Sequence, residues 1–545
     1  MKEVSLRAKR SNLLILAVTL SLFFFGTAFA GQGIKDFSNF QKIPVLDSGR
    51  LKPLDTFARN LLTQFSGKDH YEGQEASGWL AALFFDPGAT LNDKIFLIND
   101  PDIPQALGIT PQQDRRYTPK KLQQSYLLLA GLEGSSAKIP EKDRSLAENE
   151  IMRVFDNVNL YADLFSSVTI IPSSRNEEWL SLGDALKADF NNAQTRRLLM
   201  LWGDMAVSYK RGNDTAFNKA ARDYLNVVRY SLSKGDLRKT DKFPLELFYQ
   251  ASSPFTWSIM FYIFAFIFFV VSFTSSRALW YNLGLCSVLA GFIPHLWGLL
   301  MRIIIMARPP VSSLYETFIF VGLIAVFLGL LIEYYDRQWL GIVIASISGT
   351  ALLFIANKYS AEGDTLKVLV AVLNSNFWLA THVTTITMGY AATCVGGLLG
   401  HIWLLQAVFK KDSQTLDKTY KTTLGILGVA LCLTFLGTNL GGIWADQSWG
   451  RFWGWDPKEN GALMIVLWTA LLFHAKAGQM IGPRGLAIGA VIGMMVVMWA
   501  WFGVNLLSVG LHSYGFTSGI ATSLIIYAVF EISFLLATTF FIFRK

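Results

Sequence analysis

The feature that most constrains this chain is a succession of long apolar stretches in its second half. Most of them reach the roughly 20 residues that a helix needs to cross the hydrocarbon of a membrane. They occupy 255–273, 279–305, 314–334, 339–355, 377–409, 422–440, 461–475, 486–507 and 520–543. Hydrophobic residues make up 52% of the 545 residues and charged residues 16%, well below the roughly 25% of an average soluble domain. We therefore predict an all-α polytopic membrane protein with a helical transmembrane bundle of about nine spans at 253–545.

The basic charge of the chain is explained by this topology. Lys and Arg number 48 against 40 Asp and Glu, which gives a formal net charge of +8. If the first span starts outside, the predicted inner loops hold ten Lys and Arg, and the predicted outer loops of the membrane region hold five. This bias agrees with the positive-inside rule. The charge therefore requires no acidic partner. Membrane lipid is an expected partner of the chain, and nucleic acid is not.

The first 252 residues read as an export signal followed by a soluble domain. Residues 1–30 combine a basic start, an apolar run and the small residues Ala28 and Ala30 of a cleavage site. We predict cleavage after Ala30, with an uncleaved anchor as the alternative. Residues 31–252 are polar, with helical spacing of their apolar residues. They predict a mainly helical extracytoplasmic domain, to which the sequence assigns no chemistry.

The cysteine content excludes several classes of protein. Cys286, Cys394 and Cys432 all lie in apolar runs, and the sequence contains no CxxC pair. The chain is therefore not itself a c-type haem carrier, a zinc ribbon or a thiol–disulfide enzyme. Each cysteine is best interpreted as a small buried apolar residue.

A cluster of tryptophans in an expected outer loop, at 441–461, is the most unusual segment. Four stand within twelve residues: Trp444, Trp449, Trp453 and Trp455. One interpretation is an aromatic belt at the level of the lipid headgroups. The other is a binding surface for a planar apolar ligand, with Arg451 and Lys458 pairing with its carboxylates. Composition alone leaves these two interpretations about equal.

The histidines favour the binding surface. Five of the six histidines lie in the membrane half. His382 at the outer start of one span and His512 in an outer loop share the side of the tryptophan cluster, and two neutral imidazoles facing a flat aromatic pocket suit six-coordinate haem iron. His474 lies near the inner end of its span, where an ionisable residue is a functional candidate. Taken singly, each histidine is more often an interfacial or core residue.

Residues 449–459 resemble the tryptophan-rich WWD signature of haem-handling proteins. Within this group the chain is most similar to the CcsA/ResC-type membrane subunit of the system II cytochrome c synthetase. Supporting matches lie at 308–316, at His382, at 472–474 and at 510–515. The resemblance covers about 280–545, roughly half of the chain.

The resemblance implies a function in cytochrome c biogenesis, with haem b as substrate and bound ligand. It implies an outer haem site at the WWD loop in which His382 and His512 ligate the iron. The other residues expected at this outer site are Trp449, Trp453, Trp455 and Asp456. It assigns His474 to an intramembrane haem, whose second ligand stays open between His401, His295 and a partner subunit.

The resemblance also implies partners and a location. The partners are an apocytochrome c with a CxxCH motif and a ResB/CcsB-type subunit, and thiol-reducing proteins are possible. With that subunit the chain would act as a haem lyase, or holocytochrome c synthase. The expected location is the bacterial inner (cytoplasmic) membrane, with the N-terminal domain and the WWD loop on the periplasmic side.

Three alternative functions remain open. The chain could be a haem exporter without attachment activity, the haem lyase subunit of the system I pathway, or a structural anchor whose tryptophans form only a belt. Two roles are open for Asp456, Lys458 and Glu459: they either shape their loop or contact the haem propionates. Glu531, in the middle of the last span, either bonds a neighbouring helix or lines a path.

Overall fold

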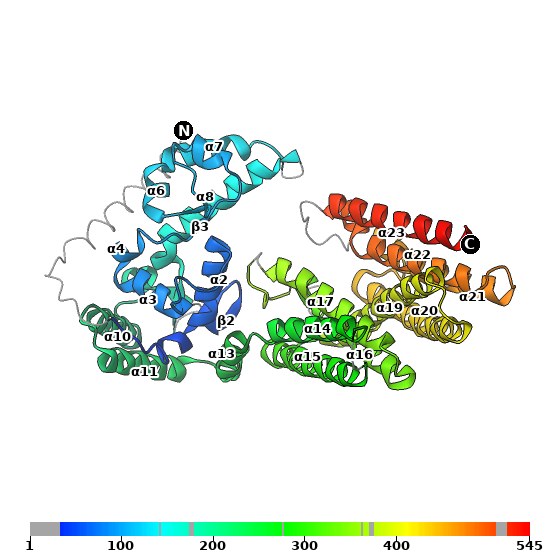
Figure 1. Ribbon diagram of the computed structural model, residues 1–545. Coiled ribbons are helices and arrows are strands. Elements are labelled where there is room, and N and C mark those ends of the chain that lie inside the picture. The colour runs from blue at the N-terminus through cyan, green and yellow to red at the C-terminus, as the bar shows by residue number, and fades with distance from the viewer. Residues whose placement is uncertain are drawn as a thin grey trace.

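The computed structural model of the chain describes residues 33–140, 143–173, 179–274, 277–360, 363–369, 375–507 and 520–544. The predicted signal segment at 1–30 and His512 lie outside these residues. Figure 1 shows an N-terminal domain, coloured from blue to teal, beside a bundle of long helices coloured from green to red. Helix α13 (Phe243–Ser252) leads from the domain into the bundle.

The N-terminal domain is mainly helical, as predicted, and encloses an apolar core of its own. Its helix α8 (Leu146–Ser167) begins with a capping box, in which the side chains of Ser145 and Glu148 each accept the other's backbone N–H. The other helices are η1 (Phe40–Lys42), α2 (Leu54–Ser66), α3 (Ala76–Phe85), α4 (Pro87–Thr90), α5 (Asp102–Ala106), α6 (Pro119–Gln124), α7 (Tyr126–Ser136), α9 (Leu182–Ala188), α10 (Ala193–Lys210), α11 (Asp214–Ser231) and α12 (Lys234–Thr240).

The domain also contains short strands that the sequence did not predict. A four-stranded antiparallel sheet has the order β2-β1-β5-β6, and β3 pairs with β4. The strands are β1 (Pro44–Asp47), β2 (Arg50–Pro53), β3 (Phe96–Leu97), β4 (Arg116–Tyr117), β5 (Thr169–Pro172) and β6 (Trp179–Ser181). Strands of two to four residues are too short to display the alternating pattern that identifies a strand in sequence. The β1–β2 hairpin turns at Ser48 and Gly49, both with positive φ.

The bundle confirms the predicted all-α polytopic membrane fold. In the described part of the chain, nine helices are long and apolar enough to cross a membrane. The bundle helices are α14 (Pro254–Val271), α15 (Arg277–Met306), α16 (Leu314–Asp336), α17 (Leu340–Ser360), α18 (Asn376–Trp378), η4 (Leu379–Val383), α19 (Thr384–Val408), α20 (Ser413–Trp449), α21 (Pro457–Ala477), α22 (Pro483–Trp501), η5 (Gly503–Leu507) and α23 (Ile520–Phe543).

The tryptophan segment differs most from its expected form. Instead of a loop over 441–461, helix α20 continues to Trp449 and α21 begins at Pro457, so the connection is only 450–456. Gly450 ends α20 in the left-handed conformation, at φ 69°. Asp456 caps α21, and Pro457 occupies its first turn. The apolar window of the predicted span ends at residue 440, but the helix itself does not.

Close packing of α19 and α20 sets the relative positions of the residues at this end of the bundle. A Cβ on Gly437 would lie 2.8 Å from the backbone of Ile386, so only glycine lets the two backbones approach this closely. The approach brings the π-helical turn η4, which carries His382, against the last turns of α20. π-helical turns of this kind occur frequently at functional sites.

Candidate functional site

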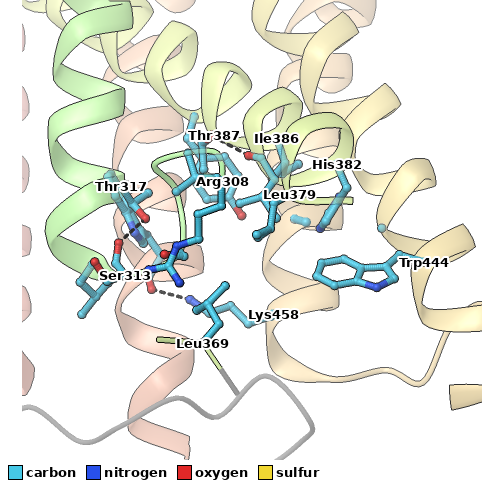
Figure 2. A pocket seen from close by; sticks show the side chains of 18 of the residues that line it. Arg308, Ser313, Thr317, Leu369, Leu379, His382, Ile386, Thr387, Trp444 and Lys458 are labelled. Carbon is cyan, nitrogen blue, oxygen red and sulfur yellow. Dashed lines mark hydrogen bonds between the residues drawn. The ribbon is translucent and has the colours of Figure 1, made fainter. Parts of the chain in front are cut away.

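A cavity of about 710 Å³ lies where α20 ends and α16 and α21 begin. Its volume falls in the range of roughly 300–1,000 Å³ that small-molecule and cofactor sites occupy. The aromatic and imidazole residues of its wall are Tyr315, Tyr359, His382, Tyr390, Trp444, Trp449, Phe452, Trp453 and Trp501. Figure 2 shows His382 and Trp444 on one side of this cavity, with Arg308 and Lys458 on the other. The cavity is thus large, walled by rings, and charged at one end.

His382 is oriented by a backbone carbonyl. Its Nδ1 lies 2.8 Å from the carbonyl oxygen of Gly437. Because a carbonyl oxygen only accepts, Nδ1 carries the proton of the neutral ring, and the lone pair is on Nε2. A histidine that ligates a metal is commonly fixed in this way through its other nitrogen. A Cβ on Gly441 would lie 2.5 Å from the imidazole, so glycine is needed there for the ring to take this position.

Two of the three tryptophans expected at the outer site line the cavity, and Trp444 lines it as well. Trp449 and Trp453 are part of the wall, together with Trp444. Trp444 packs edge-on against the His382 ring, with the ring centroids 5.9 Å apart. Trp455 does not line this cavity; it is 70% exposed and packs edge-on against Trp453 at 6.0 Å. All three tryptophans named here that line the cavity therefore come from the end of α20 and the short connection after it.

Asp456 is a helix-capping residue. Its side chain accepts the backbone N–H of Lys458 at 2.7 Å, and Glu459 accepts the N–H groups of Asp456 and Gly454 at 3.1 and 2.8 Å. This reciprocal arrangement is a capping box, which fixes the start of α21. The side chain of Lys458 lines the cavity and donates to the carbonyl of Trp501 at 2.6 Å. Asp456 and Glu459 thus shape the connection between the two helices.

Neither His474 nor His401 lines this cavity. His474 is exposed in the last turn of α21, about 24 Å along the helix from Lys458 at 1.5 Å per residue. Its Nδ1 lies 2.8 Å from the carbonyl of Ala470, which leaves the lone pair of the neutral ring on Nε2. His401 contacts the carbonyl of Gly397 through Nδ1 and the carboxylate of Glu531 through Nε2, each at 2.8 Å. Glu531 therefore bonds a neighbouring helix.

His295 is a buried core histidine. Its Nδ1 lies 3.1 Å from the hydroxyl of Tyr262, and its Nε2 lies 3.0 Å from the carbonyl of Ile319. A neutral ring satisfies both contacts, since Nε2 donates to the carbonyl and Nδ1 accepts from the hydroxyl. Both nitrogens are therefore engaged with protein, and ligation of a metal would break one of these bonds. His295 stabilises the packing of α14, α15 and α16.

A short segment, 363–369, forms the polar wall of the cavity. Arg302 donates to the carbonyl of Thr365 at 2.5 Å and to its hydroxyl at 3.1 Å. The same guanidinium forms a fully buried ion pair with Glu316 at 2.8 Å. Arg308 donates to the carbonyl of Lys367 at 2.6 Å. Two arginines from the bundle thus hold the backbone of this segment.

The N-terminal domain holds the same segment from its other side. Lys52 of the β1–β2 hairpin forms an ion pair with Asp364 at 2.6 Å, and Arg50 pairs with Glu246 of α13 at 2.8 Å. Burial disfavours the charged form of Asp364, but Lys52 and Arg50 outweigh this and lower the pKa of its carboxyl. Burial likewise opposes the charge of Arg50, but Glu246 outweighs it and raises the pKa of the guanidinium. The domain is therefore joined to the cavity wall through buried charges.

Sequence reasoning missed two parts of the site: the place of Arg308 in the cavity wall and the segment 363–369. Arg308 was part of a motif, but its contact with Lys367 joins residues 59 apart in sequence. The pair Gly441 and Gly442 was an available signal. Two adjacent glycines in an aromatic-rich helix indicate a close approach, and a Cβ on Gly442 would lie 2.6 Å from the Phe452 ring.

The fold and the site define a multi-pass helical membrane protein with a ring-walled cavity at one end of its bundle. Residues 311–512 match the model of the family described as cytochrome C assembly protein. The chain is 33% identical over 216 residues to the cytochrome c biogenesis protein CcsA of Chlamydomonas reinhardtii. It is 34% identical over 240 residues to CcsA of Synechococcus sp. strain CC9902. Each match covers 38% of this chain, and 61% and 78% of the respective relative. The chain therefore belongs to the CcsA-type family of cytochrome c biogenesis proteins.

A longer relative matches the N-terminal domain as well. Protein NrfI of Wolinella succinogenes is 27% identical over 501 residues, which is 86% of this chain and 53% of NrfI. The chain thus spans about half the length of NrfI and about three fifths of the Chlamydomonas CcsA. The family membership confirms the resemblance on which the sequence analysis relied.

Proposed function

We propose that the chain takes part in cytochrome c biogenesis by binding haem b in the cavity and presenting it for attachment to the CxxCH motif of an apocytochrome c. The observation that carries this proposal is His382, whose tautomer is set by Gly437 in a wall of tryptophan rings. The cavity volume and its rings suit a large planar ligand. Family membership supports the same function.

In this proposal each part of the cavity has a separate task. His382 would hold the haem iron, with His512 as the expected second ligand. Trp444, Trp449 and Trp453 supply rigid aromatic surface and exclude water. Bound haem would supply the vinyl groups that react with the cysteine thiols of the apocytochrome. The chain itself contributes orientation and a raised effective concentration, so no general acid or base is required.

His474 belongs to a second site in the same proposal. It stands about 24 Å from the cavity along α21, which suits an intramembrane haem on the way to the outer one. Both nitrogens of His295 and of His401 contact other groups of the chain. These contacts favour a ResB/CcsB-type partner subunit as the source of the second ligand. We place the protein in the bacterial inner membrane with the cavity on the periplasmic side.

Purification followed by visible spectroscopy tests the proposal. The wild type, expressed with its partner subunit, should show reduced haem bands, and His382→Ala and His512→Ala should lose the outer haem. His474→Ala should leave that outer haem spectrum intact. The exposed His70 provides the control, because His70→Ala removes an imidazole from the N-terminal domain. A wild-type protein without Soret absorbance would refute haem binding.

A second experiment separates attachment from export. The wild type, reconstituted with its partner subunit and a CxxCH peptide, should form the thioether bonds. A protein that binds haem but leaves the peptide unmodified would be an exporter rather than a lyase subunit.

A further inference from the structure

The charged end of the cavity contains an arginine whose hydrogen bonding is incomplete. Arg308 lies between α15 and α16 and is 7% exposed. Its Nη2 donates to the carbonyl of Lys367. Its Nε is buried and has no hydrogen-bond partner among the described residues. A buried guanidinium normally satisfies its donors, so this side chain is prepared for a further acceptor.

The carboxylate nearest to Arg308 in sequence is already engaged. Glu316 pairs with Arg302 through Oε1, and its Oε2 accepts from the backbone and hydroxyl of Ser312. Among the described residues, none of the ion pairs includes Arg308 or Lys458. A cation that is buried without an ionic partner is costly. An anionic group of a ligand would offset that cost.

The electrostatic surroundings of Arg308 also favour binding of an anionic group. Burial lowers the pKa of its guanidinium below the ordinary value, and the positive charges of Arg302 and Arg50 act in the same direction. The attraction of Glu316 opposes them but does not outweigh them. An anion beside Arg308 would therefore be attracted by three positive charges, while the engaged carboxylates of Asp364 and Glu459 also line the cavity.

Lys458 is a second cation at this end. Its ammonium donates to the carbonyl of Trp501 at 2.6 Å and approaches that of Ala500 at 3.5 Å. These are terminal carbonyls of α22, so the side chain also stabilises the end of that helix. An ammonium has three N–H donors, so one remains for a ligand.

We propose that Arg308 and Lys458 form a carboxylate-binding subsite that takes the acidic side chains of the planar ligand. This inference rests on the proposed function, because the ligand that combines a metal, a flat ring system and carboxylates on one edge is haem. Figure 2 places these two cations across the cavity from His382 and Trp444. A planar ligand held at its centre by an imidazole would direct its acidic edge toward them.

The subsite replaces part of the sequence-based expectation. That expectation assigned the carboxylates to Arg451 and Lys458, but Arg451 does not line the cavity. Its guanidinium instead packs against Gly454, in the space that a Cβ would occupy. Arg451 therefore shapes the connection between α20 and α21 and serves as a matched control.

A comparison of haem with haem dimethyl ester tests the subsite, because the ester keeps the ring and the metal but lacks the acidic groups. The purified protein, depleted of haem in detergent, is titrated with each ligand and followed at the Soret band. Arg308→Gln should weaken haem binding about ten- to a hundredfold, as expected for loss of a charge-assisted hydrogen bond. It should leave binding of the ester within about twofold of wild type. Arg451→Gln should bind both ligands as wild type does.

The outcomes separate this inference from the function on which it rests. Equal weakening of both ligands by Arg308→Gln, or a wild type that does not prefer haem over its ester, would overturn the subsite. A wild type that binds neither ligand would overturn the proposed function instead. Lys458→Met provides a second variant if Arg308→Gln fails to fold. It should likewise lose the preference for haem over haem dimethyl ester. Arg308→Lys, which keeps the charge, should recover part of the haem affinity.

Discussion

The ion pair between the N-terminal domain and the cavity wall yields the most detailed prediction. Lys52 is 1% exposed, and its ammonium lies 2.6 Å from carboxylate oxygens of both Asp364 and Asp47. Asp364 is 14% exposed, and Asp47 is 35% exposed. Lys52→Met keeps the apolar stem of the side chain and removes its charge, which leaves Asp364 buried with a weaker counterion.

The expected cost follows from burial. Removing one partner of a buried ion pair costs roughly 3–5 kcal/mol. The exposure of Asp47 and the neighbouring charge of Arg50 reduce that cost here, so we expect a loss of about 2–3 kcal/mol. For a domain of this size, each kcal/mol corresponds to about 2–4 °C in Tm. Lys52→Met should therefore unfold about 4–12 °C below wild type.

The pH dependence of this link has a definite sign. The folded pKa of Asp364 is lowered, because Lys52 and Arg50 outweigh the effect of burial. A lowered folded pKa means that the stabilisation is complete above the unfolded pKa of about 3.9 and is lost as the pH falls through the folded value. The Tm difference between wild type and Lys52→Met should therefore persist at neutral pH and shrink in acid.

Thermal unfolding in detergent and hydrogen exchange of residues 363–369 measure the effect. Lys52→Met should raise exchange in that segment, and Lys52→Met combined with Asp364→Leu should cost less than the two single losses together. The control is Lys94→Met, which removes an exposed partner of Asp114 and should change stability little. Additive losses, or unchanged exchange at 363–369, would show that the hairpin does not hold the cavity wall.

Three further predictions concern single side chains, each measured by thermal unfolding in detergent. His295→Phe should destabilise the bundle by about 2–4 kcal/mol, because the hydroxyl of Tyr262 loses its partner in a buried position. Glu531→Leu should cost about 1–3 kcal/mol by removing the acceptor at His401, while Glu531→Gln, whose amide can donate to Nε2, should retain most of the stability. Asp456→Ala removes the cap of α21 and should cost about 1 kcal/mol. An unchanged midpoint in any of these variants would contradict the role given to that side chain.

The sequence predicted the membrane helices well, because length and hydropathy alone decide whether a segment can cross a bilayer. It predicted their ends less well. The window that ended at residue 440 missed the last turns of α20, where Trp444 and Trp449 remain helical beyond the apolar run. Gly450 and Pro457 mark the true ends, and their capping chemistry is readable in the sequence. Periodicity also missed the strands of the N-terminal domain, which are too short to show it.

The sequence indicated the aromatic and imidazole residues of the candidate site better than its polar residues. His382, Trp449 and Trp453 lie together in the wall of one cavity, whereas Trp455 points to the surface and Asp456 caps a helix. His512, the expected second ligand, lies outside the described residues. The carbonyl that orients His382 belongs to another helix, α20. The glycines of α20 indicate a close approach, but the sequence does not say which segment approaches.

The segment 363–369 explains how the N-terminal domain can influence the cavity. Lys52 of the domain holds its Asp364, and two arginines of the bundle hold its backbone at Thr365 and Lys367. These three attachments fix a stretch too short to fold by itself, so its position depends on all of them. We therefore expect a change in the β1–β2 hairpin to alter the charged end of the cavity, although the hairpin contributes no residue to its wall.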